Sequence, residues 1–168
     1  MSKAKKKIVG ILKSFFYAFR GIWFCFKTER NIRIHCSIAF YVLLFSRFYD
    51  FSRTDYAIIL LSIGAVICAE MLNTAIEASV DLSSPNYHEL AKKSKDIAAG
   101  AVLVSAIIAA CIGVVYFFDA AKIHEIFDYY KNNTAQLIGL AVTFVCWLAL
   151  IFSVEPSNHI TDKEKDKK

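Results

Sequence analysis

Charged residues are missing from two long stretches of the chain. Residues 97–118 and 135–154 contain no Asp, Glu, Lys or Arg, and residues 56–80 contain only two acids. Uncharged apolar runs of about 20 residues are candidates for membrane-spanning helices. With 57% hydrophobic residues among 168, this pattern excludes a soluble globular domain and excludes disorder over most of the chain. We therefore expect an all-α integral membrane protein.

Paired cysteines and glycine-rich loops are also missing. The five cysteines lie singly in apolar stretches without a C-x-x-C pair, so we interpret them as small buried hydrophobic residues. The six glycines form neither G-x-x-x-x-G-K-S/T nor G-x-G-x-x-G, the common nucleotide-binding loops of soluble proteins. A nucleotide would have to be held by a helix face and a loop.

Five segments follow from the distribution of charge and apolar residues. Residues 1–30 mix basic and apolar residues at helical spacing, which predicts an amphipathic helix on the membrane surface. Residues 31–118 would form a core of three spans, and the uncharged part of the first, 34–46, is only 13 residues long. We expect an external loop at 119–134, an additional fourth transmembrane helix at 135–154 and a charged cytoplasmic tail at 155–168.

Positive charge is unevenly distributed between the predicted connections. Residues 1–33 hold nine basic residues and one acid, and lysines recur at 92–95 and in the tail, whereas the other connections hold fewer. Because the more basic connections of membrane proteins face the cytoplasm, we expect both termini and the 81–95 loop on that side. Basic residues beside apolar sequence favour anionic lipid, so we expect no nucleic-acid partner.

Three acids and an amide share one face at the end of the second predicted span. At about 100° per residue, Glu70, Asn73, Glu77 and Asp81 fall within an arc of roughly 80°. Glu77 would lie near the cytoplasmic interface and Glu70 up to about 10 Å deeper, where an acid marks a functional site. Carboxylates at an interface suit magnesium, and Glu70 could take a proton from a lipid hydroxyl.

Other charged residues are expected at the same membrane face. Glu29 precedes the first span, and Lys95 and Asp96 open the third, where a helix N-terminus and a lysine favour phosphate. The combination favours magnesium-assisted phosphoryl transfer to a molecule dissolved in the membrane. Glu70 and Glu77 could instead pair with basic residues to hold helices together, and we interpret His35 as a packing or interface histidine.

Three other functions make different demands on the sequence. A small channel subunit lined by the Glu70 face would have charges within further spans, and the last two spans have none. A membrane scaffold would not need an acid at that depth. A phosphatase would usually need a nucleophile or an arginine-rich phosphate pocket, and the sequence offers neither.

The run E-x-x-N-T-A-I-E-x-x-x-D at residues 70–81 resembles the signature of the prokaryotic diacylglycerol kinase and undecaprenol kinase family. The resemblance extends from about Phe15 to Phe118. Its further matches are Tyr17, Arg20-Gly21, the run E-R-N-I-R-I-H at 29–35, Tyr87-His88 and Lys95-Asp96. It implies a small homotrimeric kinase of a bacterial inner membrane, with active sites shared between subunits and facing the cytoplasm.

The resemblance also assigns roles to individual residues. Glu70 would be the catalytic general base, and Glu29 and Glu77 would hold Mg²⁺. The residues that would contact ATP are Tyr17, Asn73, Tyr87, His88, Lys95 and Asp96. The chain departs from the family at Gly10, where some members have an arginine that Lys7 or Lys13 could replace, and at Asn86, where an acid is usual.

The lipid alcohol substrate would be undecaprenol or diacylglycerol. The patterns E-R-N-x-R-x-H at 29–35 and S-P-x-Y-H at 84–88 resemble the branch from Gram-positive-type bacteria, which is associated with undecaprenol. We therefore expect conversion of undecaprenol to undecaprenyl phosphate, with conversion of diacylglycerol to phosphatidic acid as the alternative. The predicted fourth span lies outside the resemblance.

Overall fold

The computed structural model of the protein describes residues 3–153, and describes side chains from residue 10 onward. This part of the chain contains six helices and no strand: α1 (Lys3–Thr28), α2 (Arg30–Ser46), α3 (Arg53–Ser83), α4 (Glu89–Phe117), α5 (Ala120–Asn132) and α6 (Thr134–Phe152). The prediction of an all-α membrane fold is confirmed. The tail predicted at 155–168 lies outside the described residues.

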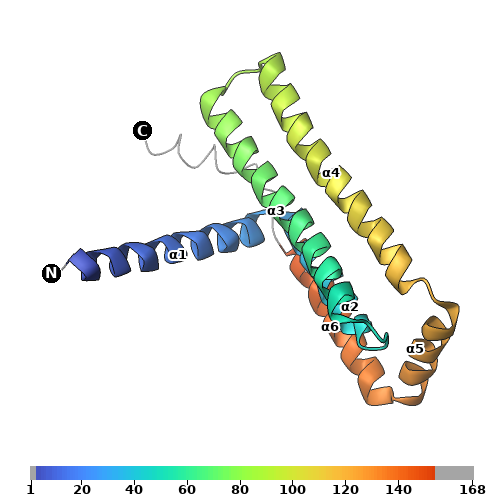
Figure 1. Ribbon diagram of the computed structural model, residues 1–168. Coiled ribbons are helices and arrows are strands. Elements are labelled where there is room, and N and C mark those ends of the chain that lie inside the picture. The colour runs from blue at the N-terminus through green and yellow to red at the C-terminus, as the bar shows by residue number, and fades with distance from the viewer. Residues whose placement is uncertain (1–2, 154–168) are drawn as a thin grey trace.

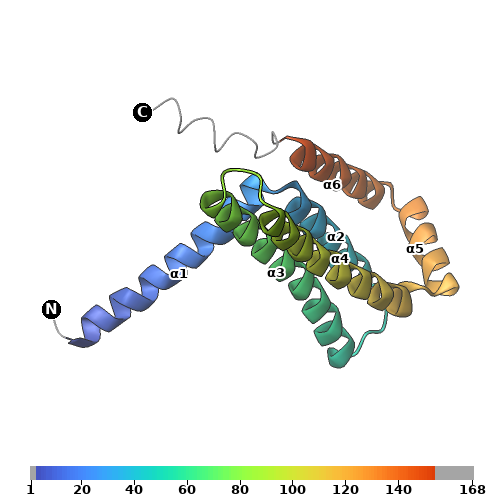
Figure 2. The same ribbon diagram turned by 90° about the horizontal axis from the view of Figure 1, so that it is seen from above.

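The helices α3 and α4 form an antiparallel pair with the most extensive helix–helix contact of the bundle (Figures 1 and 2). They contain 31 and 29 residues, or about 46 and 44 Å of helix, which exceeds a hydrocarbon core of about 30 Å. Together with α6 they are the three described helices that are long and apolar enough to cross a membrane. Leu61 on α3 and Val115 on α4 are 74% and 80% exposed, as expected for side chains that face lipid.

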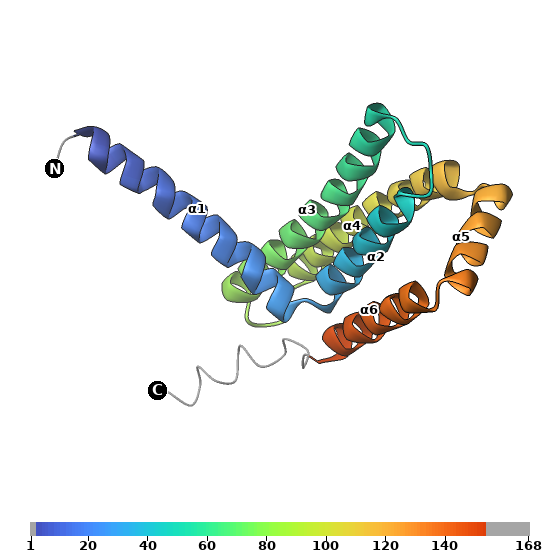
Figure 3. The same cartoon turned by 90° about the horizontal axis from the view of Figure 1, so that it is seen from below.

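The shorter helix α2 lies between the α3–α4 pair and α6 (Figure 3). Its 17 residues span about 26 Å, in keeping with the weak first span of the sequence. The Tyr41 hydroxyl donates to Thr143 Oγ1 of α6 at 3.3 Å, and the rings of Phe40 and Trp147 lie 6.2 Å apart. The fourth predicted span therefore packs on the first.

Both arginines that flank the apolar part of α2 bind protein groups. Arg33 is buried, and its Nη1 donates to the carbonyl of Lys27 at 3.3 Å. Arg47 donates to the Tyr130 hydroxyl of α5 at 3.1 Å and lies over the Phe48 ring. These contacts join α2 to α1 at one end and to α5 at the other.

The N-terminal helix α1 extends away from the bundle (Figures 1 and 3). Phe15, Phe16 and Phe19 are more than 60% exposed, and Lys27 lies over the Trp23 ring. A protruding helix with exposed aromatic and basic residues has the composition of a membrane-surface helix.

Residues 119–134, expected as a loop, contain the helix α5. Asp119 caps its start, because its Oδ1 accepts from the backbone N–H groups of Ala121 and Lys122. Tyr130 is 7% exposed and receives the Arg47 bond described above. The helix has only 13 residues, and Tyr130 is its one buried residue, whereas Ile123 and Phe127 stay exposed.

The segments that carry most of the candidate residues lie at one end of the bundle, where α6 also ends. The α1–α2 junction, the α3–α4 turn and the end of α6 lie at this end, and the α2–α3 loop and α5 lie at the other (Figures 1 and 3). Ser52 and Asp55 form a capping box at the start of α3, and His88 caps α4 by accepting from the Leu90 N–H. These caps fix where the two long helices begin.

The cysteines agree only partly with the expectation that they are buried. All five are free, and Cys25 is buried at the end of α1. Cys68, Cys111 and Cys146 are exposed on α3, α4 and α6, because a spanning helix in a small bundle leaves much of its surface to lipid. They act there as small apolar surface residues.

Candidate active site

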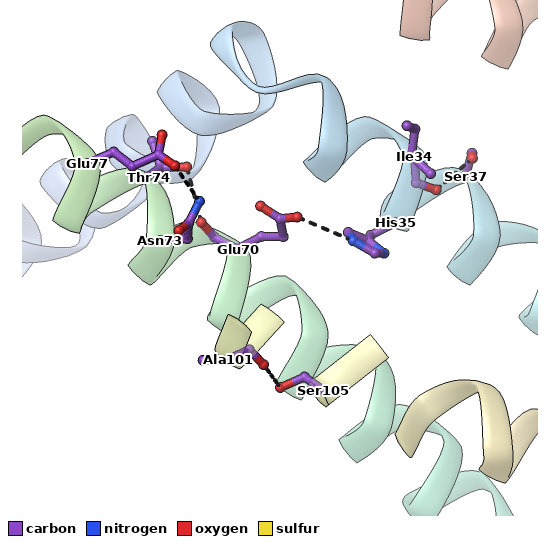
Figure 4. A network of polar contacts seen from close by, with 9 residues as sticks. All are labelled: Ile34, His35, Ser37, Glu70, Asn73, Thr74, Glu77, Ala101 and Ser105. Atoms are coloured by element: carbon purple, nitrogen blue, oxygen red, sulfur yellow. Dashed lines mark hydrogen bonds and ion pairs between the residues drawn. The ribbon is translucent and has the colours of Figure 1, made fainter. Parts of the chain in front are cut away.

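Glu70 is a buried acid in the middle of the α2–α3 interface. It is 3% exposed, and its Oε1 lies 3.4 Å from Nε2 of His35 on α2 (Figure 4). The neighbouring Thr74 donates its hydroxyl to the Glu70 carbonyl at 3.1 Å. Sequence reasoning assigned His35 to packing, and the structure places it beside the acid predicted as general base. The only sequence signal was its position within the run 29–35.

Asn73 and Glu77 are joined on the same face of α3. The Nδ2 of Asn73 donates to Oε1 of Glu77 at 3.0 Å (Figure 4), as expected for residues four apart on a helix. The Oδ1 of Asn73 is buried and has no hydrogen-bond partner among the described residues. A buried acceptor without a partner is costly unless a further group binds there.

Glu29 joins this acidic region from the α1–α2 junction. It has extended backbone angles at the start of α2 and makes no side-chain cap bond. Burial raises the pKa of the Glu29 carboxyl, and the negative charges of Glu77 and Glu70 raise it further. The Thr28 hydroxyl and Arg33 act in the opposite direction. Three carboxylates from two segments therefore repel one another in one region. We call Glu29, Glu70 and Glu77 the acidic cluster.

The acidic cluster offers the oxygen ligands that a hard cation prefers. Glu29, Glu77 and the free Oδ1 of Asn73 are all oxygen donors, and a divalent cation would relieve the repulsion that raises the Glu29 pKa. Within residues 3–153, no group of three or more His, Cys, Asp or Glu side chains is placed to hold a metal ion by itself. Mg²⁺ usually keeps waters and phosphate oxygens among its ligands, so these two carboxylates would hold it only together with a nucleotide.

A second group of candidate residues surrounds a cavity of about 280 Å³ at the α3–α4 turn. Tyr87, His88 and Lys95 all line this cavity, which we call the loop pocket. Lys95 binds the carboxylate of Asp81, which also lines it. The other lining residues are Val80, Ser84, Pro85, Asn86, Ala91 and Lys92. Lys92 and Lys95 give the loop pocket the positive charge that phosphate requires.

Two predicted residues lie outside both groups in the single chain. Asp96 is exposed on α4 and does not line the loop pocket. Tyr17 is 61% exposed on the protruding α1, beside Phe16. The described chain thus brings together Glu29, Glu70, Asn73 and Glu77 in one group, and Tyr87, His88 and Lys95 in another. From Glu77 to Asp81 the helix rises by only about 6 Å, so the two groups are neighbours.

Comparison with known proteins identifies the family. Residues 16–117, more than half of the chain, match the family described as prokaryotic diacylglycerol kinase. The chain belongs to this family. The matched range includes α2, α3 and α4 in full, together with both groups of candidate residues, and the resemblance seen in the sequence is confirmed.

Individual relatives are lipid kinases by name. The chain is 47% identical to an undecaprenol kinase of Bacillus subtilis over 105 residues, which cover 62% of this chain and 85% of that protein. It is 42% identical to a diacylglycerol kinase of Synechocystis over 104 residues, 61% of this chain but only 59% of that protein. A diacylglycerol kinase of Escherichia coli is 29% identical over 99 residues, 59% of this chain and 81% of that protein. The protein is thus a membrane lipid kinase, as predicted.

Proposed function

We propose that this kinase transfers the γ-phosphoryl group of ATP to undecaprenol at the cytoplasmic face of a bacterial inner membrane. The observation that carries the proposal is a buried acid and a basic pocket on the same helix pair, about 15 Å apart along α3. Glu70 lies within a membrane-spanning helix, and Lys95 lines the loop pocket beyond the next turns of the same helix pair. Because a lipid hydroxyl approaches from the membrane and a nucleotide from water, the reaction needs both Glu70 and the loop pocket.

Each group has a distinct role in the proposed reaction. Glu70 takes the proton of the lipid hydroxyl while the hydroxyl oxygen forms a bond to the γ-phosphorus of ATP. The bond between this phosphorus and the bridging oxygen breaks, ADP leaves, and Glu70 later releases its proton to water. Lys95, His88 and Tyr87 hold the nucleotide in the loop pocket, and Asn73 and Asp96 complete its contacts.

Glu29 and Glu77 would hold Mg²⁺, with the buried Oδ1 of Asn73 beside them. Magnesium bound there would neutralise charge on the phosphates of the nucleotide. The protein's own contribution is to keep several acids close together, and burial, followed by the charges of Glu77 and Glu70, raises the pKa of the Glu29 carboxyl.

A homotrimer with shared sites accounts for the position of Tyr17. In its own chain Tyr17 is exposed on a helix that leaves the bundle, so a contact with nucleotide would be made in a neighbouring subunit. The many exposed apolar residues of α3 and α4 leave surface for such neighbours as well as for lipid. The basic residues of 1–33 and 92–95 favour the cytoplasmic side for this end of the bundle.

The choice of undecaprenol is supported by the 47% identity to the Bacillus subtilis undecaprenol kinase. Diacylglycerol is the second candidate, since the Synechocystis relative at 42% is a diacylglycerol kinase. A channel is disfavoured, because the lipid-crossing part of α4 and the whole of α6 carry no charged residue.

The deciding experiment compares lipid alcohols with the purified protein in bilayers. Labelled ATP and Mg²⁺ are supplied with undecaprenol, diacylglycerol or no added lipid, and phosphorylated lipid is measured. We expect undecaprenol to give the highest kcat/KM. A higher kcat/KM for diacylglycerol would make diacylglycerol the substrate instead of undecaprenol. Transfer of phosphate to neither lipid would overturn the proposed function.

A further inference from the structure

The contact between His35 and Glu70 joins the proposed base to a different helix. Nε2 of His35 lies 3.4 Å from Oε1 of Glu70, which is within ion-pair distance and slightly longer than an ordinary N–H···O hydrogen bond (Figure 4). The Glu70 side chain is 4% exposed and that of His35 is 21% exposed. Among the side chains of residues 10–153, His35 is the one basic group within ion-pair distance of Glu70. The base therefore depends on α2 for its polar contact.

Packing alone does not explain a histidine at position 35. Its other side borders a cavity of about 290 Å³ between α2, α3 and α4. The cavity is lined mainly by apolar residues, among them Val42, Val66 and Phe117. A leucine or isoleucine would suit this apolar boundary better than an imidazole does. The imidazole therefore contributes chiefly through its nitrogen atom beside Glu70.

We propose that His35 is a positioning residue for Glu70, an inference that rests on the proposed role of Glu70 as general base. An N–H at Nε2 of His35 that moves a few tenths of an ångström closer to Oε1 of Glu70 donates to it and fixes the orientation of the carboxylate. The other oxygen, Oε2, is left to take the proton of the lipid hydroxyl. The imidazole proton stays on His35 throughout, so the contact directs the base without relaying its proton.

The effect of losing this contact falls on the catalytic rate. A base that is displaced by about 1 Å loses on the order of 10²-fold in rate, while the loop pocket that holds the nucleotide is formed by other residues. His35→Leu should therefore lower kcat by about 10- to 100-fold and leave the KM values for ATP and lipid within about two-fold. His35→Gln places an amide N–H near the position of Nε2 and should keep at least about a third of the rate.

The test measures kcat, both KM values and thermal stability for His35→Leu, His35→Gln and Glu70→Gln, and for the double variant that combines His35→Leu with Glu70→Gln. Ser62→Ala is the control, because Ser62 lines the same cavity but donates to its own helix at Ile59. We expect no further loss in the double variant, since a positioning contact has no effect once the base is gone. Ser62→Ala should keep its full rate.

Several outcomes would overturn the inference. They are a His35→Leu rate within about two-fold of the wild type, equal losses in His35→Leu and His35→Gln, and multiplied losses in the double variant. If His35→Leu does not assemble, His35→Asn takes its place, because its shorter amide is withdrawn from Glu70; a normal rate in that variant would equally contradict the proposal. An active Glu70→Gln would instead reject the base, and with it the proposed mechanism on which the inference rests.

Discussion

Glu70 owes its proposed role to its surroundings. A carboxylate that is 3% exposed within a membrane-spanning helix costs several kcal/mol unless it has partners. The structure supplies one partner, His35, at 3.4 Å, and leaves the second carboxylate oxygen for other use. A purely structural acid would be better replaced by an apolar residue of similar size.

Glu70→Gln is expected to lower turnover by about 10²–10⁴-fold, because glutamine keeps the shape of the side chain but cannot accept a proton at neutral pH. The rate of lipid phosphorylation, the Kd for ATP and the oligomer size are measured on one preparation. Glu125→Gln, an exposed acid on α5, is the control and should be normal. A folded Glu70→Gln oligomer with near-normal turnover would exclude Glu70 as the base.

Glu29→Gln and Glu77→Gln are each expected to raise the Mg²⁺ concentration needed for the half-maximal rate. Each change removes one anionic oxygen ligand from the acidic cluster and keeps the shape of the side chain. Magnesium titrations of the rate at saturating ATP measure the effect, and we expect a shift of about ten-fold or more. Unchanged titrations in both variants would remove these residues from the metal site.

The raised pKa of the Glu29 carboxyl also predicts how stability depends on pH. A carboxyl whose pKa is higher in the folded than in the unfolded state favours folding when it is protonated, and this contribution is lost as the pH rises through the raised value. Without Mg²⁺ at neutral pH, Glu29→Gln should therefore raise the Tm by about 1–3 °C. The gain should vanish below the ordinary carboxyl pKa of 4.5. A lower Tm for Glu29→Gln in Mg²⁺-free buffer at neutral pH would contradict this sign.

The helices differ in what they contribute. The candidate residues come from α1 to α4, from the α1–α2 junction and from the α3–α4 turn, whereas α5 and α6 contribute none. α6 instead covers α2 through Tyr41 and Thr143, and Arg30 lies over the Phe152 ring at 4.6 Å. The added helix is thus a support for the short span that carries His35.

Removal of the residues after Asn133 is expected to leave an active but less stable kinase. The truncated protein should keep kcat within about three-fold, because no candidate residue is lost, and its Tm should fall by several degrees as the contacts of α2 are removed. Lipid phosphorylation, Tm and oligomer size are measured together. A truncated protein that assembles normally but is inactive would show that α6 belongs to the site.

The sequence predicts elements better than it predicts contacts between them. The uncharged stretches locate α3, α4 and α6 within a few residues, apart from their polar first turns, because lipid requires apolar runs of a set length. Helical spacing also places Asn73 beside Glu77. The pairing of His35 with Glu70 depends on how α2 lies against α3, and no local pattern encodes this. The short helix α5 was missed, and the contact of its Tyr130 with Arg47 at the end of α2 likewise depends on the tertiary fold.

The two ends of the molecule differ in what they contain: aromatic rings pack at one end, and most candidate residues lie at the other. At the end of α2, α3 and α4 that lies away from the acidic cluster, the rings of Tyr49, Phe51 and Phe117 pack together. The opposite end carries the acids and the loop pocket, and α1 leaves the bundle there. In the proposed homotrimer, α1 would reach a neighbouring subunit without opening its own bundle.

The proposed sharing of sites between subunits predicts that two inactive variants complement each other. Tyr17→Ala and Glu70→Gln are each expected to lose most activity, and a mixed oligomer should regain about a quarter of the wild-type rate, since some sites then combine an intact Tyr17 with an intact Glu70. Equimolar co-expression and measurement of lipid phosphorylation test this. Mixed oligomers no more active than the separate variants would place Tyr17 and Glu70 in the same subunit's site.

The bond between Tyr41 and Thr143 joins residues that are 102 positions apart, and this separation sets an order of events during synthesis. At about 5–20 residues per second, a ribosome needs roughly 5–20 s to proceed from one to the other. During that interval α2 has entered the membrane with α3 and α4 but without its last neighbour. The nascent kinase therefore completes its proposed site residues well before it completes its bundle.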